Sequence, residues 1–153
     1  MNKKTIIHTS QAPAAIGPYA QAVGYQGMLF LSGQIALDTH TGSLLQAGIE
    51  EQTRLVMHNI QSVLEAAGLD MTHILRTTVY LKNMSDYHIV NDIYGEYFDE
   101  HPPARTTVEV SRLPQDALVE IEALAAAPSQ VQPEPPAQPD AQASADEGSE
   151  ESV

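Results

Sequence analysis

The segment 102–127 constrains the fold most strongly, because it contains two runs in which polar and apolar residues alternate. The pattern is clearest in the second run, where two glutamates separate three apolar residues: Val119, Glu120, Ile121, Glu122 and Ala123. A period of two is typical of a half-buried β-strand. Residues 113–116, Leu-Pro-Gln-Asp, favour a turn, because proline fixes φ and aspartate can bond its own backbone. The segment therefore predicts two neighbouring strands joined by a tight turn.

These two strands carry charged side chains that strand interiors seldom contain. Arg105 opens the first strand, and Glu120 and Glu122 lie within the second, although glutamate is depleted in strands. A guanidinium group can bind a planar carboxylate through two hydrogen bonds, and a nearby carboxylate can move the proton of a water or an ammonium group. Two interpretations follow: a site for a ligand that carries a carboxylate, or a structural ion pair between Arg105 and one of the glutamates across adjacent strands.

The same segment, PPARTTVEVSRLPQDALVEIEALA, resembles the C-terminal signature of the Rid family, the reactive intermediate deaminases that are also called YjgF or L-PSP proteins. Three other stretches resemble the family in the same order: APAAIGPYAQAV at 12–23, LSGQIALDTHTG at 31–42, and the run 50–68. The resemblance spans residues 5–127. Within the family, the sequence is similar to the RidA subgroup, whose activity is the hydrolysis of 2-imino acids. This similarity rests on the combination of Tyr19, Ser32, Arg105 and Glu120.

The resemblance implies a reaction and a role for each of these residues. The reaction is the hydrolytic deamination of 2-iminopropanoate and 2-iminobutanoate to 2-keto acids and ammonia. The resemblance implies that Arg105 binds the substrate carboxylate. It also implies that Glu120 orients a water molecule and transfers protons. It places Tyr19 at the mouth of the site, lent by a neighbouring subunit. The other substrate-binding positions that it implies are Ser32, Gly33, Asn91 and the backbone of Thr107.

The residues themselves leave simpler interpretations open at several of these positions. Tyr19 ends a loop that contains proline and glycine, and it can be a packing residue whose hydroxyl bonds the backbone. Ser32 and Gly33 can simply end a strand. Asn91 falls on a predicted helix and can equally face solvent.

The order of the predicted elements indicates an α+β fold. These elements are strands at 4–9, 22–25, 28–35 and 74–81, the two strands of segment 102–127, and helices at 49–67 and 85–99. A hairpin with Gln26-Gly27 at its turn joins the second and third strands. Leu75, Val79 and Leu81 are expected to share the buried face of the fourth.

Both helices are expected on one face of a mixed sheet, and the resemblance implies the chorismate mutase-like fold. The other face of the sheet must also be buried, so its apolar positions favour self-association. The resemblance makes this assembly a homotrimer with a cleft at each subunit interface.

Composition divides the chain into a predicted domain and a predicted tail. The 153 residues suit one domain, which we place at 1–127, and the proline-rich acidic segment 128–153 is expected to be disordered because it cannot bury enough apolar surface. The seven basic and fourteen acidic residues up to position 127 give a net charge of −7, and the six acidic residues after it give −6. Such a charge argues against a nucleic-acid partner, whose site needs clustered lysine and arginine.

Several classes of protein lack support in the sequence. There is no cysteine, so disulfides and thiolate chemistry are excluded. No phosphate-binding loop or HExxH motif occurs, and the six histidines are scattered, so we expect neither a metal nor another cofactor. The chain begins without an apolar signal segment and contains no run of transmembrane length, which predicts a cytoplasmic protein without a membrane partner.

Two other functions remain as alternatives to the deaminase. One is the endoribonuclease and translation inhibitor activity reported for some L-PSP proteins, which the negative charge and the lack of a histidine pair disfavour. The other is a non-catalytic, small-ligand-binding or chaperone-like trimer. The presence of both Arg105 and Glu120 favours the enzyme, because a protein that only binds carboxylates has no evident need for Glu120.

Overall fold

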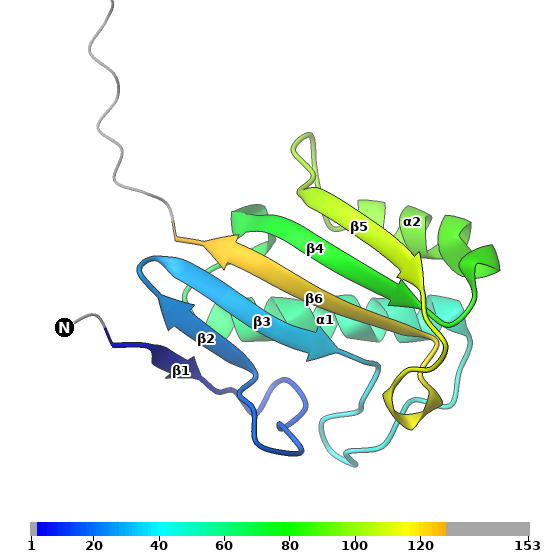
Figure 1. The fold of residues 1–153 in the computed structure, drawn as a ribbon, viewed down its shortest axis with the longest axis horizontal. Coiled ribbons are helices and arrows are strands. Elements are labelled where there is room, and N and C mark those ends of the chain that lie inside the picture. The colour runs from blue at the N-terminus through cyan, green and yellow to red at the C-terminus, as the bar shows by residue number, and fades with distance from the viewer. Residues whose placement is uncertain (1–2, 128–153) are drawn as a thin grey trace, which may run out of the picture.

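The computed structural model describes residues 3–127, which form one sheet with two helices (Figure 1). The strands are β1 Thr5–Ile7, β2 Ala22–Tyr25, β3 Met28–Gln34, β4 Ile74–Leu81, β5 Ala104–Glu109 and β6 Val119–Ala126. The helices are α1 Ile49–Ala66 and α2 Tyr87–Gly95, and short 3₁₀ turns occur at η1 Met71–His73, η2 Met84–Asp86 and η3 Pro114–Asp116. The predicted order of strands and helices is confirmed. The predicted tail, 128–153, lies outside the described residues.

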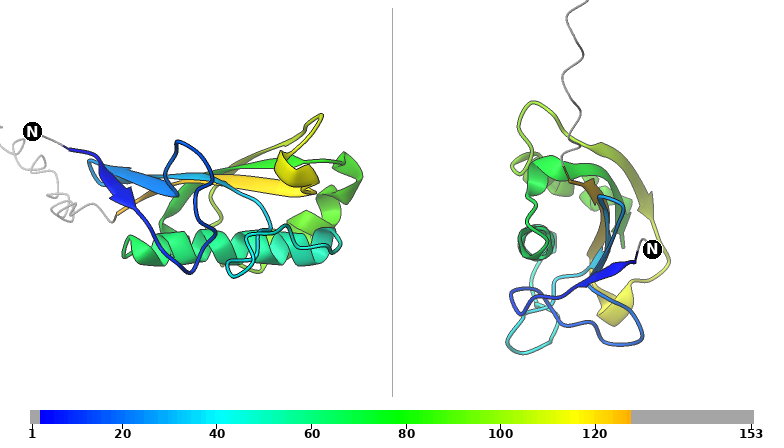
Figure 2. Two further views of the ribbon diagram at one scale, coloured as in Figure 1. Left: turned by 90° about the horizontal axis from the view of Figure 1, so that it is seen from below. Right: turned by 90° about the vertical axis from the view of Figure 1, so that its left-hand side faces the viewer.

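The sheet is mixed, with the strand order β1-β2-β3-β6-β4-β5. Only β4 and β5 pair in parallel among the described strands. Both helices lie on the same side of the sheet, as the edge-on views show (Figure 2), which confirms the predicted α+β layers. The opposite face of the sheet, here called the open face, has no covering helix in residues 3–127.

The hairpin of β2 and β3 forms where the sequence predicts it. Tyr25 pairs with Met28, and the turn residues Gln26 and Gly27 have φ angles of 50° and 78°. Positive φ at both central positions defines the turn type whose twist suits a two-residue hairpin. Glycine adopts this conformation without steric cost at the second position.

The core lies between the sheet and α1, and β6 supplies its centre. The residues of β6 alternate between buried and half-buried along the whole strand. Val119 and Ile121 are fully buried with Val56 and Ile60 of α1, while Glu120 and the other intervening residues face away from the helices. This confirms the period of two that the sequence shows.

The predicted pairing of the two C-terminal strands is wrong. The turn at η3 exists, but β6 pairs with β3 and β4, and β5 lies at the sheet edge beyond β4. The connection through α2 explains this arrangement, because a helix joins parallel neighbours and thereby brings β5 next to β4. A period of two reveals a strand but not its partner. The structural ion pair across adjacent strands is therefore excluded, since β4 separates Arg105 from Glu120 and Glu122.

Two local predictions also fail for identifiable reasons. Leu75 is 50% exposed and Ile74 is buried, because a register shift between Ile74 and Arg76 interrupts the alternation in β4. The second helix is shorter than predicted, because η2 precedes α2 and turns follow Gly95. None of the helices in residues 3–127 combines the length and the hydrophobicity that a membrane span requires.

Candidate active site

The predicted site residues fall into two groups on opposite faces of the sheet. Directly paired residues of adjacent strands point to the same face. Arg105 pairs with Thr77, which is buried against α2, so Arg105 points to the face that the helices cover. Glu120 alternates with the buried residues Val119 and Ile121, so it points to the open face. One chain therefore does not bring the Arg105 guanidinium and the Glu120 carboxyl together.

Three residues of α2 hold the Arg105 guanidinium. Its Nη2 donates hydrogen bonds to Asn91 Oδ1 at 2.7 Å and to the Tyr87 hydroxyl at 3.0 Å. Its central carbon lies 4.7 Å from the centre of the Tyr94 ring and 5.6 Å from that of the Tyr87 ring, within the range of cation–π attraction. Positions 87, 91 and 94 share one helix face by their spacing, so a single face of α2 orients the guanidinium.

The Tyr94 hydroxyl anchors this arrangement in the core. It lies 2.7 Å from Thr77 Oγ1 in a buried hydrogen bond. Burial raises the pKa of Tyr94 above its usual value, against smaller opposing effects of Thr77 and the Arg105 charge, so the hydroxyl stays protonated at neutral pH. The Tyr94 ring therefore has a fixed position under the guanidinium.

Arg105 keeps hydrogen-bond donors available. Within residues 3–127 it has no carboxylate partner, and its Nη1 and Nε make no hydrogen bond. A guanidinium that is oriented by neutral groups and keeps its charge uncompensated suits a planar anion such as a carboxylate.

On the open face, Tyr19, Ser32, Gly33 and Glu120 line one cleft, together with Glu122. The cleft has a volume of about 600 Å³ and lies between the loop before β2, the end of β3, the η3 turn and β6. Residues 13–16 of the loop supply an apolar wall. The cleft is therefore large enough for a small organic acid beside the Glu120 carboxyl.

Buried polar contacts fix the loop that forms this wall. Gln21 is 3% exposed, accepts a hydrogen bond from the Thr9 N–H at 2.8 Å and donates to the carbonyl of Pro13 at 2.8 Å. The Tyr19 hydroxyl accepts from the Ile16 N–H at 3.2 Å, which is the backbone partner expected of a packing tyrosine. The Ser32 hydroxyl donates to the Ala20 carbonyl at 2.6 Å. Tyr19 and Ser32 thus shape the cleft within the chain.

The Glu120 carboxyl lies in an environment that favours its protonated form. Burial raises its pKa above the usual glutamate value, and the nearby Glu122 carboxylate adds to this effect. The Tyr80 hydroxyl donates to Glu122 Oε1 at 3.2 Å, and no lysine or arginine of residues 3–127 pairs with Glu120. A raised pKa brings a carboxyl closer to the pH at which one group can both accept and donate a proton.

The structure thus places the predicted residues in two separate groups. Asn91 contacts Arg105 directly, and Thr107 lies two residues further along the same face of β5. The sequence analysis missed Tyr87 and Tyr94 as supports of Arg105, because their helical spacing also fits a core stripe. The spacing of positions 87, 91 and 94, which places the two tyrosines on the same helix face as Asn91, could have identified them. No sequence signal identified Gln21.

Glu120→Gln is expected to be more stable than the wild type at neutral pH. The raised pKa means that the folded state favours the protonated carboxyl, so this group stabilises the fold below the ordinary glutamate pKa and loses that contribution as pH rises through the folded pKa. A glutamine side chain stays neutral throughout. Melting temperatures at acid and neutral pH should show a gain for the variant that disappears in acid, while the exposed Glu100→Gln control changes little. Lower stability of Glu120→Gln at neutral pH would contradict this account.

Comparison with known proteins identifies the family. Residues 9–127 match the family described as endoribonuclease L-PSP. A RutC family protein of Pyrococcus horikoshii is 50% identical over 122 residues, which cover 80% of this chain and 97% of the relative. The human 2-iminobutanoate/2-iminopropanoate deaminase is 41% identical over 122 residues, which cover 80% of this chain and 89% of the relative.

A solved structure has the same architecture. YyfA of Yersinia pestis, described as a protein of unknown function in the conserved Rid family, superposes with a TM-score of 0.80 at 48% identity. The superposition covers 82% of this chain and 100% of YyfA. Since both the sequence match and the fold extend over nearly all of the described residues, the protein belongs to the Rid family, also called the YjgF or L-PSP family, and has its chorismate mutase-like fold.

Proposed function

We propose that this Rid protein hydrolyses reactive 2-imino acids, in particular 2-iminopropanoate and 2-iminobutanoate, to 2-keto acids and ammonia. The observation that carries the proposal is the Arg105 guanidinium, which α2 orients and which has no carboxylate partner within residues 3–127. Such a group is suited to bind an external carboxylate, and every 2-imino acid supplies one. The name of the human relative describes the same reaction for that protein.

We further propose that each active site combines two copies of the chain. Arg105 with Asn91 and Thr107 forms one half-site, and Glu120 with Tyr19, Ser32 and Gly33 forms the other. Because they lie on opposite faces of one sheet, the two half-sites can meet only when different copies supply them. A homotrimer with one site at each of its interfaces satisfies this requirement through rotational symmetry.

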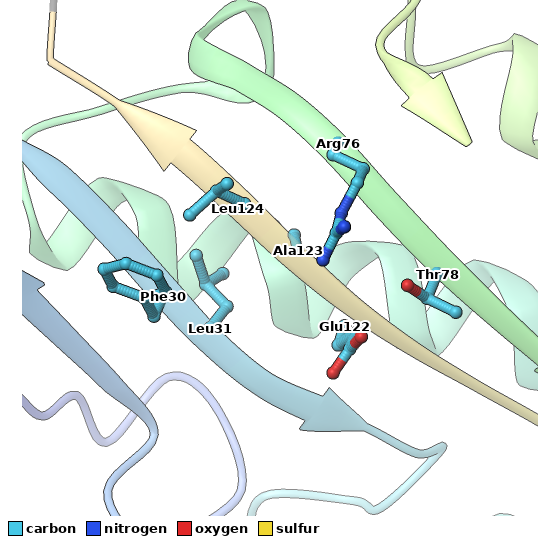
Figure 3. A pocket seen from close by; sticks show the side chains of 7 residues that line it. All are labelled: Phe30, Leu31, Arg76, Thr78, Glu122, Ala123 and Leu124. Atoms are coloured by element: carbon cyan, nitrogen blue, oxygen red, sulfur yellow. The ribbon is translucent and has the colours of Figure 1, made fainter. Parts of the chain in front are cut away.

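The open face of the sheet supports self-association. Ile6, Val23, Phe30 and Leu124 are paired in register and form an apolar row across four strands. Ile6 is 55% exposed and Phe30 is 52% exposed. Figure 3 shows Phe30 and Leu124 on this face, with Arg76 extending from β4 over β6. A continuous apolar row that one chain leaves in water is stabilised when a second copy covers it.

The proposed mechanism needs only positioning and proton transfer. Arg105 of one copy binds the substrate carboxylate, and Glu120 of another lies beside the imine carbon. Glu120 accepts a proton from water as the water oxygen bonds to that carbon, and delivers it to the nitrogen to give a carbinolamine. It then takes the hydroxyl proton and returns it to the nitrogen as the C–N bond breaks, which releases ammonia and the 2-keto acid. Fixing the two reactants lowers the barrier of a reaction that already proceeds in water.

Purified protein should accelerate imine hydrolysis and leave RNA intact. 2-Iminopropanoate is generated from alanine by an amino-acid oxidase, and its lifetime is measured with and without the protein. The same preparation is incubated with RNA, because the family description names an endoribonuclease. An unchanged imine lifetime would refute the deaminase, and in that case RNA cleavage would favour the nuclease while intact RNA would favour a binding protein.

A further inference from the structure

We infer that Gly33 is a positioning residue for Glu120: the side chain that Gly33 lacks leaves the space in which the Glu120 carboxyl lies. The inference rests on the proposed function in so far as it concerns catalysis, but the packing relation can be tested without any activity. It assigns Gly33 a role within its own chain, separate from any backbone contact with substrate.

A bulge in β3 brings Gly33 to this position. Leu31 pairs with Ala123, but the next pair in register is Gln34 with Ile121. Two residues of β3, Ser32 and Gly33, therefore stand opposite the single residue between Ala123 and Ile121. A β-bulge of this kind bends the strand and redirects the extra residue, and bulges are frequent beside active sites.

The space at Gly33 is filled by Glu120. A Cβ atom built on Gly33 would overlap Glu120 Oε1, and it would lie 2.9 Å from Cδ and 3.1 Å from Cγ of the same side chain. These are the three nearest atoms, so Glu120 is the group that a larger residue would displace. Because Gly33 is absent from the glycines of positive φ, space rather than backbone conformation requires glycine here.

A Cβ atom added to any other glycine of the described chain would not overlap a neighbouring side chain in this way. A Cβ on Gly24, in the same sheet, would lie 3.7 Å from its nearest neighbour, Thr5 Cβ, which is an ordinary contact. Gly24 is therefore a matched control, since Gly24→Ala adds the same methyl group to a strand of the sheet without displacing a side chain.

Gly33→Ala should reduce imine hydrolysis about a hundredfold, the size of effect that a displacement near 1 Å can cause. The substitution forces the Glu120 carboxyl out of its space and further into the cleft, where it is more exposed to water. Gly24→Ala should retain wild-type activity. Circular dichroism and light scattering should show that both variants keep the fold and the assembly of the wild type.

The pH profile separates positioning from a general structural effect. The charged or titratable groups near Glu120 are Glu122 on β6, Tyr80 on β4 and Tyr19 of the loop before β2, which lines the same cleft. By contrast, β3 contributes only the uncharged Ser32 and Gln34 beside Gly33. Because burial is the main cause of the raised pKa of Glu120, exposure of the carboxyl lowers it. The acid limb of the rate profile of Gly33→Ala should therefore move to lower pH, and an acid limb that stays in place would overturn the inference.

A double-mutant cycle provides the test that needs no activity. Gly33→Ala should lower the melting temperature in the wild-type background and have little effect in a Glu120→Ala background, because the displaced side chain is then absent. Equal losses in the two backgrounds would overturn the inference. If the wild type fails to hydrolyse imines, the proposed function is refuted, while this cycle still decides whether Gly33 positions Glu120.

Discussion

Arg105→Lys is expected to fold normally and to lose at least about a hundredfold in imine hydrolysis, equivalent to about 2.7 kcal/mol of transition-state stabilisation. Lysine retains the positive charge but lacks the planar fork that binds a carboxylate through two hydrogen bonds. It also cannot reproduce the combination of hydrogen bonds to Asn91 and Tyr87 with a planar cation over the Tyr94 ring. Arg105→Ala should lose still more, because the charge is absent too.

The matched control for this substitution is Arg112→Lys. Arg112 is exposed and pairs with Asp116 four residues away, at 2.8 Å, and surface pairs of this kind contribute little. Its activity and melting temperature should both remain near those of the wild type. Melting temperatures and iminopropanoate hydrolysis rates are measured for all three variants. Full activity in a folded Arg105→Lys protein would refute the role of Arg105 as a carboxylate clamp.

Mixing two inactive variants, Arg105→Ala and Glu120→Ala, is expected to restore activity. An interface is functional when one copy supplies an intact Arg105 half-site and its neighbour an intact Glu120 half-site. Random exchange of subunits at equal concentration produces such interfaces with a probability of about one quarter, so about a quarter of the wild-type rate should return. The effect is large because each variant alone has no functional site.

Light scattering defines the assembly in which this complementation occurs. The wild type should have three times the chain mass of 16.6 kDa. Differently tagged copies must be shown to exchange, by co-purification after mixing. Exchange without recovery of activity would show that the two half-sites do not meet between copies, and a stable, active monomer would refute the shared site altogether.

The sequence by itself determined the local structure and the composition of the candidate site. The alternation of polar and apolar residues in β6 revealed a half-buried strand whose glutamate side chains point away from the core. The pair Gln26-Gly27 predicted the hairpin that the structure contains. These features depend on neighbouring residues, because side-chain direction and turn conformation are set by a few consecutive φ and ψ angles. The family resemblance likewise rests on short motifs, which the sequence displays in full.

Only the tertiary structure decided how these pieces are combined. The helical connection between β4 and β5 places β4 between Arg105 and Glu120, and a bulge in β3 turns Gly33 toward Glu120. A period of two specifies which residues share a face, but the same pattern fits any partner strand, so pairing depends on long-range packing. For this reason the residues of the candidate site were recognisable from the sequence, whereas their separation onto opposite faces of the sheet was not.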